Sequence, residues 1–222
     1  SHALDEYGDI APADLQLEVL ESSMLSDLDA VSEAMRRARR LGVSFALDDF
    51  GTGYSSLAYL RHLPTNVLKI DQSFIREMMS STDDLSIISA VIGMAKAFGM
   101  QIIAEGVESI EQGNLLLKLG CYQGQGYGIA RPMPADQLID WVQNWKTPSA
   151  WHGQQPVASH NLPLLYAEVE HNYWLGQVEQ YLSGTNAAVP ALDYHQCKMG
   201  VWIDTEARSR FKHCLRFSRF TH

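Results

Sequence analysis

The sequence has little cysteine, no long apolar run and no basic start. Only 3 of the 222 residues are cysteine, at positions 121, 197 and 214, which is too few and too scattered for a disulfide framework. No stretch approaches the roughly 20 consecutive apolar residues that span a bilayer, and residues 1–6 lack the basic and apolar regions of a signal peptide. We therefore expect a soluble cytoplasmic protein with no membrane segment.

Net negative charge is confined to the first two thirds of the chain. Residues 1–150 hold 20 Asp and Glu against 11 Lys and Arg, a net of -9, whereas residues 151–222 hold 6 of each. An acidic surface argues against binding DNA or RNA, because phosphate contacts need clustered lysine and arginine. The acidic part instead suits a protein whose carboxylates hold a divalent metal ion.

The first 147 residues alternate short apolar runs with segments of helical period. Each run is rich in Val, Ile or Leu and ends in polar or acidic residues, which is typical of a strand followed by a crossover helix. The expected strands are 15–20, 43–47, 67–70, 101–104 and 124–129, and the expected helices are 27–41, 54–62, 85–98, 110–119 and 135–145. Gly42, Gly99 and Gly120 stand where three helices should end. The pattern predicts an α/β fold of parallel βα units.

A change of composition marks a second unit. Residues 148–163 are rich in Pro, Gln and Ser without a sustained period, which is typical of a linker. Residues 164–182 then form an amphipathic pattern, which predicts one helix. We therefore divide the chain into residues 1–147, a linker at 148–163 and an unrelated small α-helical unit at 164–222.

Acidic and polar residues lie at or just after the carboxyl end of each expected strand. In chain order they are Glu18 and Glu21, Asp48 and Asp49, Lys69 and Asp71, Glu105 and Glu108, and Gln125 by the fifth strand. In a parallel α/β barrel these strand ends meet at one mouth. Crowded carboxylates raise one another's pKa unless a cation compensates them, and oxygen-only ligands favour Mg²⁺ or Mn²⁺. Two such ions would serve an in-line phosphoryl displacement. Alternatively, each acid caps the following helix or faces solvent.

Five motifs in this part follow the order seen in a known family. They are Leu17-Glu18-Val19-Leu20-Glu21-Ser22, Asp48-Asp49-Phe50-Gly51-Thr52-Gly53-Tyr54-Ser55-Ser56-Leu57, Leu68-Lys69-Ile70-Asp71, Ala104-Glu105-Gly106-Val107-Glu108, and Gln125-Gly126-Tyr127 with Arg131-Pro132. Together they resemble the EAL-domain phosphodiesterases of cyclic di-GMP. The resemblance implies a modified TIM barrel that uses Mg²⁺ or Mn²⁺ to hydrolyse one phosphodiester of cyclic di-GMP, giving linear pGpG.

The resemblance also implies roles for the residues at the strand ends. Glu18 and Asp48 would be ligands of the first metal ion, and Asp49 would be shared with the second ion or lie close to it. Glu105 would hold the second ion or act on the attacking water, which Lys69 would position.

Two further residues and one loop would support this site. By resemblance, Glu108 and Gln125 would support the metal site, Glu108 through the loop that follows Asp49. That loop, residues 51–56, would also take part in a homodimer contact, as it does in the family. Alternatively, its glycines mark a tight turn in which Ser55 caps a helix.

Two metal ligands of the family have no counterpart in the sequence. In the family, a glutamate of the Glu-Ala-Leu segment and an asparagine lie well upstream of the Glu18 motif, but only 17 residues precede Glu18 here. The chain therefore resembles the second half of an EAL barrel. Five strands cannot close an eight-stranded barrel, so we expect an incomplete TIM-like barrel with an exposed strand edge. We also expect the chain to be unstable, aggregation-prone or dependent on a partner, and to have weak or no activity alone.

The C-terminal unit contains a mixed nitrogen and sulfur set: His171 and, about two dozen residues later, His195 and Cys197. Such a set suits Zn²⁺ better than Mg²⁺. A helical histidine beside Trp174 and a lone cysteine are, alternatively, ordinary core or surface residues.

The spacing His-x-x-Trp followed by His-x-Cys-x-x-Gly-x-Trp resembles the CZB domain, a zinc-binding helical module of chemoreceptors and of some cyclic di-GMP enzymes. That resemblance implies three histidines and one cysteine as zinc ligands. Residues 208–222 do not continue the family pattern, so His222 or His213 is the candidate for the fourth ligand.

Two hypotheses of different class follow. The first is a metal-dependent phosphodiesterase of cyclic di-GMP whose output is regulated by a zinc-sensing module. The second is a non-catalytic regulator that binds cyclic di-GMP or a partner protein while the module senses zinc or oxidant. The intact acids at the strand ends favour the enzyme, and the missing upstream Glu and Asn favour the regulator.

Overall fold

The computed structural model describes residues 10–25, 28–52, 60, 63–185, 188–190, 193 and 198–210. The chain divides into two compact units. The first contains residues 1–76 and 86–156, and the second contains residues 77–85 and 157–222. The division after residue 156 falls within the segment expected to be a linker.

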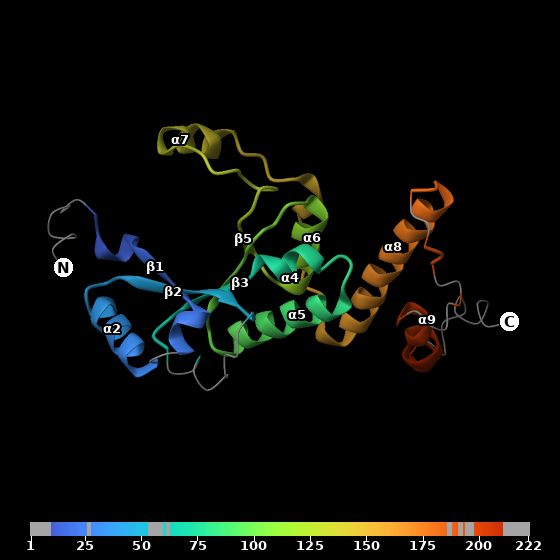
Figure 1. Cartoon of the computed structure of the whole chain (residues 1–222), viewed down its shortest axis with the longest axis horizontal. Coiled ribbons are helices and arrows are strands. Elements are labelled where there is room, and N and C mark those ends of the chain that lie inside the picture. Colours follow the sequence, from blue (N-terminus) through green and yellow to red (C-terminus); the bar gives the residue numbers. More distant parts are fainter. Residues whose placement is uncertain are drawn as a thin grey trace. The chain divides into compact units, whose positions relative to one another are not determined.

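The first unit is built on a parallel five-stranded sheet whose strands follow the order of the chain (Figure 1). The strands are β1 (Gln16–Leu20), β2 (Ser44–Phe50), β3 (Val67–Ile70), β4 (Gln101–Ala104) and β5 (Gln123–Gly124). Every neighbouring pair is parallel, with Leu47 opposite Leu68 at the centre. The predicted α/β fold with parallel strands is confirmed.

Three strands differ from their expected bounds. β1 begins at Gln16 rather than at residue 15, and β2 continues to Phe50, so that both of its aspartates lie within the strand. β5 is only two residues long. Beyond it the chain lies directly on the backbone of Val107, since a Cβ at Gly126 would stand 2.3 Å from the Val107 nitrogen. This close approach requires glycine and leaves no room for an extended strand.

Four helices follow the periodicity of the sequence. They are α2 (Leu28–Arg40), α5 (Thr82–Ala97), α6 (Ile110–Leu119) and α7 (Ala135–Asn144). In α6 the Ser109 hydroxyl accepts a hydrogen bond from the Gln112 N–H, and Gly120 ends the helix at φ 88°. The expected helix 54–62 lies outside the described residues, apart from Leu60.

A fifth helix, α4 (Gln72–Glu77), was not expected from the sequence. It is less than two turns long, which is too short for a 3.6-residue period to show. Because α4 follows β3 directly, it fixes the direction in which the chain leaves the strand that carries Lys69.

The core of the first unit surrounds the central strands. All four residues of β3 are buried, and β2, α5 and α6 contribute further side chains: Phe45, Leu47, Ile88, Ile92, Leu115 and Leu116. In contrast, β1 and α7 contain no buried residue. An exposed edge strand in the same sheet as a fully buried central strand agrees with a partial barrel.

The second unit contains α8 (Leu162–Leu182), α9 (Lys198–Trp202), a π-helical turn (Ile203–Ala207) and α10 (Arg208–Arg210). α8 begins two residues before the predicted helix and packs with α9. None of the helices in the described ranges combines the length and the apolar character needed to cross a bilayer.

Candidate active site

The carboxyl end of β2 contains a β-bulge. Leu47 pairs with Leu68 and Phe50 with Ile70, so between these two pairs β2 contains one more residue than β3. Neighbouring residues of a regular strand point to opposite faces. Here Asp49 has a φ of 54°, an uncommon value for a residue other than glycine. As a result, Asp48, Asp49 and Glu105 each bring one carboxylate oxygen within 4.8 Å of the other two.

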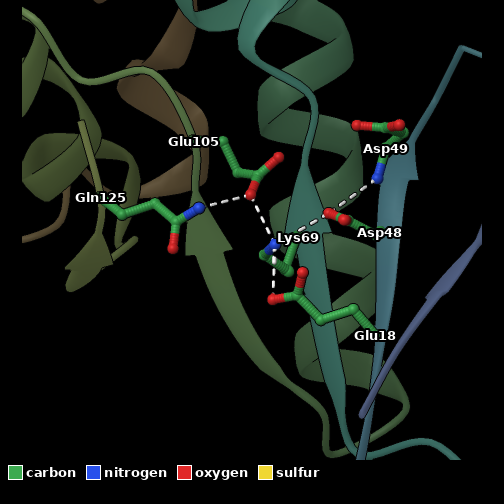
Figure 2. A network of polar contacts seen from close by, with 6 residues as sticks. All are labelled: Glu18, Asp48, Asp49, Lys69, Glu105 and Gln125. Atoms are coloured by element: carbon green, nitrogen blue, oxygen red, sulfur yellow. Dashed lines mark hydrogen bonds and ion pairs between the residues drawn. The ribbon is translucent and has the colours of Figure 1, made fainter. Parts of the chain in front are cut away.

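Lys69 of β3 extends into the centre of this acidic group (Figure 2). Its Nζ lies 2.7 Å from Glu18 Oε1, 2.9 Å from Asp48 Oδ1 and 2.6 Å from Glu105 Oε1. An ammonium has three N–H donors, so these contacts use all of them. One lysine thereby joins side chains from β1, β2 and the end of β4.

Hydrogen bonding decides the charge of Lys69. Burial acts to lower its pKa, but the bonds to Glu105, Glu18 and Asp48 outweigh burial and hold the pKa well above its usual 10.5. Lys69 is therefore an ammonium at neutral pH. It can donate hydrogen bonds and compensate negative charge there, but it cannot accept a proton.

In two of the acids, Glu105 and Asp49, burial is the largest effect and the pKa is raised. Burial raises the pKa of the Glu105 carboxyl, and the charges of Asp48 and Asp49 raise it further. The bonds to Lys69 lower this pKa but do not fully offset the rise. The pKa of Asp49 is also raised, first by burial and then by the charges of Asp48 and Asp71. The group thus carries more negative charge than one lysine compensates.

A divalent cation fits this donor set. Glu18, Asp48, Asp49 and Glu105 offer only carboxylate oxygens, which are the ligands that Mg²⁺ and Mn²⁺ prefer. The excess negative charge among them would fall when a cation binds, and the raised pKa values of Asp49 and Glu105 would fall with it.

Two other acids from the strand ends support the loops beside the site. Glu21, which is 2% exposed, accepts a hydrogen bond of 2.8 Å from the Gly51 N–H and so holds the chain just after Asp49. Asp71 accepts hydrogen bonds from the backbone N–H and the hydroxyl of Ser73. Burial raises the pKa of Asp71, but these bonds outweigh burial and lower the pKa below its usual value.

Gln125 and Glu108 line the same hollow, and Gln125 also contacts Glu105. Gln125 Nε2 donates a hydrogen bond of 2.6 Å to Glu105 Oε1 (Figure 2), which brings this amide into the group as predicted. The exposed Glu108 instead lines a neighbouring hollow of about 580 Å³, together with Gln125 and with Arg76, Tyr127 and Arg131. The Arg131 guanidinium lies 4.8 Å from the centre of the Tyr127 ring.

Sequence reasoning missed one buried polar residue beside the site, Gln112. Its side chain is hydrogen-bonded to the segment that carries Glu108 and to the end of α4. The sequence signal that could have identified it is the pair Ser109 and Gln112, which has the spacing of a capping box.

The predicted zinc ligands are described only in part. His171 lies on α8 with its ring stacked on that of Trp174, the two centres 5.7 Å apart. His195, Cys197, His213 and His222 lie outside the described residues. The zinc site therefore stays a prediction.

Comparison with known proteins was made for the sequence and for the structure. The model of the EAL domain family matches residues 1–132. The cyclic di-GMP phosphodiesterase PA2567 of Pseudomonas aeruginosa is 47% identical to this chain over 135 residues, which are 61% of this chain and 23% of that protein. The chain thus spans less than a quarter of this relative.

Solved structures give the same result. The MucR phosphodiesterase in complex with c-di-GMP matches with a TM-score of 0.60 and 44% identity, over 62% of this chain and 55% of that chain. The manganese and cyclic di-GMP complex of Klebsiella pneumoniae BlrP1 matches with a TM-score of 0.56 and 28% identity, over 59% of this chain and 34% of that chain. With the family model matching more than half of its length, this chain belongs to the EAL domain family.

Proposed function

We propose that this chain is the part of a cyclic di-GMP phosphodiesterase that carries most of its metal-binding acids, and that it acts by hydrolysing one phosphodiester to give linear pGpG. The observation that carries the proposal is the group of Asp48, Asp49 and Glu105 around the Lys69 ammonium. The same acids favour an enzyme over a non-catalytic regulator, because binding a nucleotide without turnover does not require them.

The carboxylates of Glu18, Asp48, Asp49 and Glu105 would hold Mg²⁺ or Mn²⁺, which supplies a water that is acidic enough to be used as hydroxide near neutral pH. If a cation took over some of these carboxylates, the Lys69 ammonium would have N–H donors free to position the attacking water, and it would balance charge on the phosphodiester. Glu105 would hold the second ion or accept a proton from the attacking water. Gln125 keeps the Glu105 carboxylate in place by donating to it.

The hollow beside Glu105 supports a nucleotide as the substrate. Its volume of about 580 Å³ lies within the range of small-molecule sites, which is roughly 300 to 1,000 Å³. Arg76 and Arg131 supply positive charge for phosphate, and the exposed Tyr127 ring offers a face for a base. Glu108 would support the metal site from this hollow.

The test is to incubate the chain with cyclic di-GMP and Mn²⁺ and to separate the products by chromatography. We expect pGpG at a low rate, because the upstream Glu and Asn ligands are absent from this chain. Glu105→Gln should abolish the product, and Glu111→Gln, at an exposed position of α6, should leave it unchanged. Tight binding of cyclic di-GMP without turnover would support the non-catalytic regulator instead, and absence of both binding and turnover would contradict both functions.

We also propose that the C-terminal unit binds Zn²⁺ through His171, His195 and Cys197, with His222 or His213 as fourth ligand, and that it regulates the phosphodiesterase. The spacing of these residues, which resembles that of the CZB domain, supports this proposal, and His171 lies on a helix, α8. Metal analysis of the purified chain should find about one zinc per chain, reduced in His171→Ala and Cys197→Ser but not in His152→Ala. An equal zinc content in all four proteins would exclude this site.

A further inference from the structure

We propose that Gln112 is a positioning residue of the active site, which locks the loop 105–109 against α4 and thereby sets the place of Glu105 relative to Lys69. The inference rests on the proposed function, because it assigns to Gln112 a part in the same site. Gln112 touches neither metal nor substrate in this role and acts only through the segments that it joins.

The first observation is that the Gln112 amide makes three hydrogen bonds, two through its oxygen and one through its nitrogen. Its Oε1 accepts hydrogen bonds from the Glu108 N–H at 2.8 Å and from the Ser109 N–H at 3.0 Å. Its Nε2 donates at 2.9 Å to the carbonyl of Ile75. The residue is 7% exposed and its bond to Ile75 is buried, so this bond is costly to leave unmade.

The second observation concerns what these bonds connect. Ile75 lies in the last turn of α4, where helix carbonyls lack partners within the helix. α4 follows β3 and Lys69, whereas Glu108 and Ser109 follow β4 and Glu105. Gln112 therefore joins the segment that follows Lys69 to the segment that follows Glu105, and these two residues form an ion pair of 2.6 Å.

The third observation is that the loop and α4 are in close contact. Gly106 has a φ of 69°, and a Cβ at this position would stand 2.7 Å from the Gln72 Cβ, so the loop passes directly over the first residue of α4. On its other side the loop is bonded to the β5 connection, because the Val107 N–H donates to the Gln125 carbonyl at 3.0 Å. Gln112 is thus the side chain that fastens one face of a loop whose other face holds Gln125.

The experiment compares Gln112→Met and Gln112→Glu in the full chain. Methionine keeps the length of the side chain and removes all three bonds, whereas glutamate still accepts from Glu108 and Ser109 but cannot donate to Ile75. Leu115→Ala is the matched control, since Leu115 is buried in the same helix and its loss destabilises without touching the loop.

The first readout is amide hydrogen exchange at Val107, whose N–H bonds to Gln125 and not to Gln112. We expect Gln112→Met to speed exchange at Val107 by about tenfold relative to Leu68 of β3, and Gln112→Glu to have a smaller effect. In Leu115→Ala, both amides should speed up by the same factor. Equal factors for Val107 and Leu68 in Gln112→Met would show that Gln112 has only a general structural role and would overturn the proposal.

The second readout is the split between kcat and KM for cyclic di-GMP. A positioning role lowers kcat in Gln112→Met by about tenfold or more while KM stays nearly constant. A fall in activity that matches the loss of folded protein in Leu115→Ala would contradict it. If the wild-type chain shows no turnover, the proposed function fails at that point, and the exchange at Val107 still decides the role of Gln112.

Discussion

β1 and β3 belong to the same parallel sheet, yet their surroundings are opposite. All four residues of β3 are buried, whereas β1 has no buried residue and leaves Leu17 and Leu20 41% and 45% exposed. Both strands nevertheless supply the active site, through Lys69 and Glu18. The candidate active site therefore extends from β3, at the buried centre of the sheet, to β1, an edge strand whose outer side has no neighbour among the described residues.

The ion pair between the two strands has the same asymmetry. The Lys69 side chain is 4% exposed and that of Glu18 is 49% exposed. A contact between a buried ammonium and an exposed carboxylate contributes less than its distance of 2.7 Å suggests, because water screens the outer partner. Of the three contacts, that with the less exposed Glu105 contributes most to the raised pKa of Lys69.

Removing the lysine should have the largest effect. Lys69→Met leaves the surrounding carboxylates without their compensating charge, and we expect a loss of about 3 kcal/mol or more in the free energy of unfolding. Urea denaturation followed by circular dichroism measures this loss. Lys146→Met, at an exposed position of the same unit, is the control and should change the value little. Equal stability of the two variants would refute the account of the ion pairs.

Truncation of one leucine in each strand tests the contrast directly. Leu68→Ala in β3 should cost about 3 kcal/mol, since it opens a cavity at a fully buried position. Leu17→Ala in β1 should cost less than about 0.5 kcal/mol because Leu17 is exposed. The same denaturation experiment measures both. A large cost for Leu17→Ala would mean that β1 is covered in solution, for instance by a second copy of the chain.

Metal binding should stabilise the chain in a manner that depends on pH. The folded-state pKa values of Glu105 and Asp49 are raised. Without metal, the stability that these two groups contribute is therefore present at low pH and is lost as pH rises through the raised pKa values. Mn²⁺ binds the ionised carboxylates, and at 100 times its Kd it should add about 2.7 kcal/mol.

Thermal melts with and without Mn²⁺ at pH 5 and pH 8 check this expectation. The increase in Tm should be larger at pH 8, because at pH 5 binding of Mn²⁺ must displace more protons from these carboxyls. Asp49→Asn should remove most of the increase at both values. An increase that is the same at the two pH values would argue against binding at this group.

A hydrogen bond on the β5 side of the sheet is expected to contribute less than the contacts of Lys69 and Leu68. The Trp151 indole N–H donates to the Ile110 carbonyl at 2.9 Å, and its ring covers Gly113, where a Cβ would stand 2.3 Å from the ring. Trp151→Phe loses the hydrogen bond and should cost about 1 kcal/mol. Chemical denaturation measures it, with Trp145→Phe as the matched tryptophan control. No difference between the two variants would mean that this bond adds nothing to stability.

Much of the fold could be predicted from the sequence because the central strands have a simple pattern. β3 and β4 are short apolar runs between turn residues, and their bounds are as predicted. α4 could not be predicted because it is too short to show a period. The length of β5 depends on the close contact of Gly126 with Val107, which brings together residues from different βα units and leaves no local signal.

The sequence predicted which side chains gather in the candidate active site, but not their geometry. Strand-end position and residue type identified Glu18, Asp48, Lys69 and Glu105 as members of one group, as the ion pairs of Lys69 show. The bulge at Asp49 could not be predicted, since the sequence gives no register between β2 and β3. The bonds of Gln112 depend on the same kind of long-range register.

The left-handed backbone of Asp49 has a consequence for how sequence can change at this site. A non-glycine residue at positive φ carries a conformational cost on the order of 1 kcal/mol or more, which glycine does not carry. Asp49→Gly would relieve that cost and remove one of the crowded carboxylates, so folding alone would favour the substitution. At Asp49 the backbone conformation and the proposed metal site therefore favour different residues, glycine for the first and aspartate for the second.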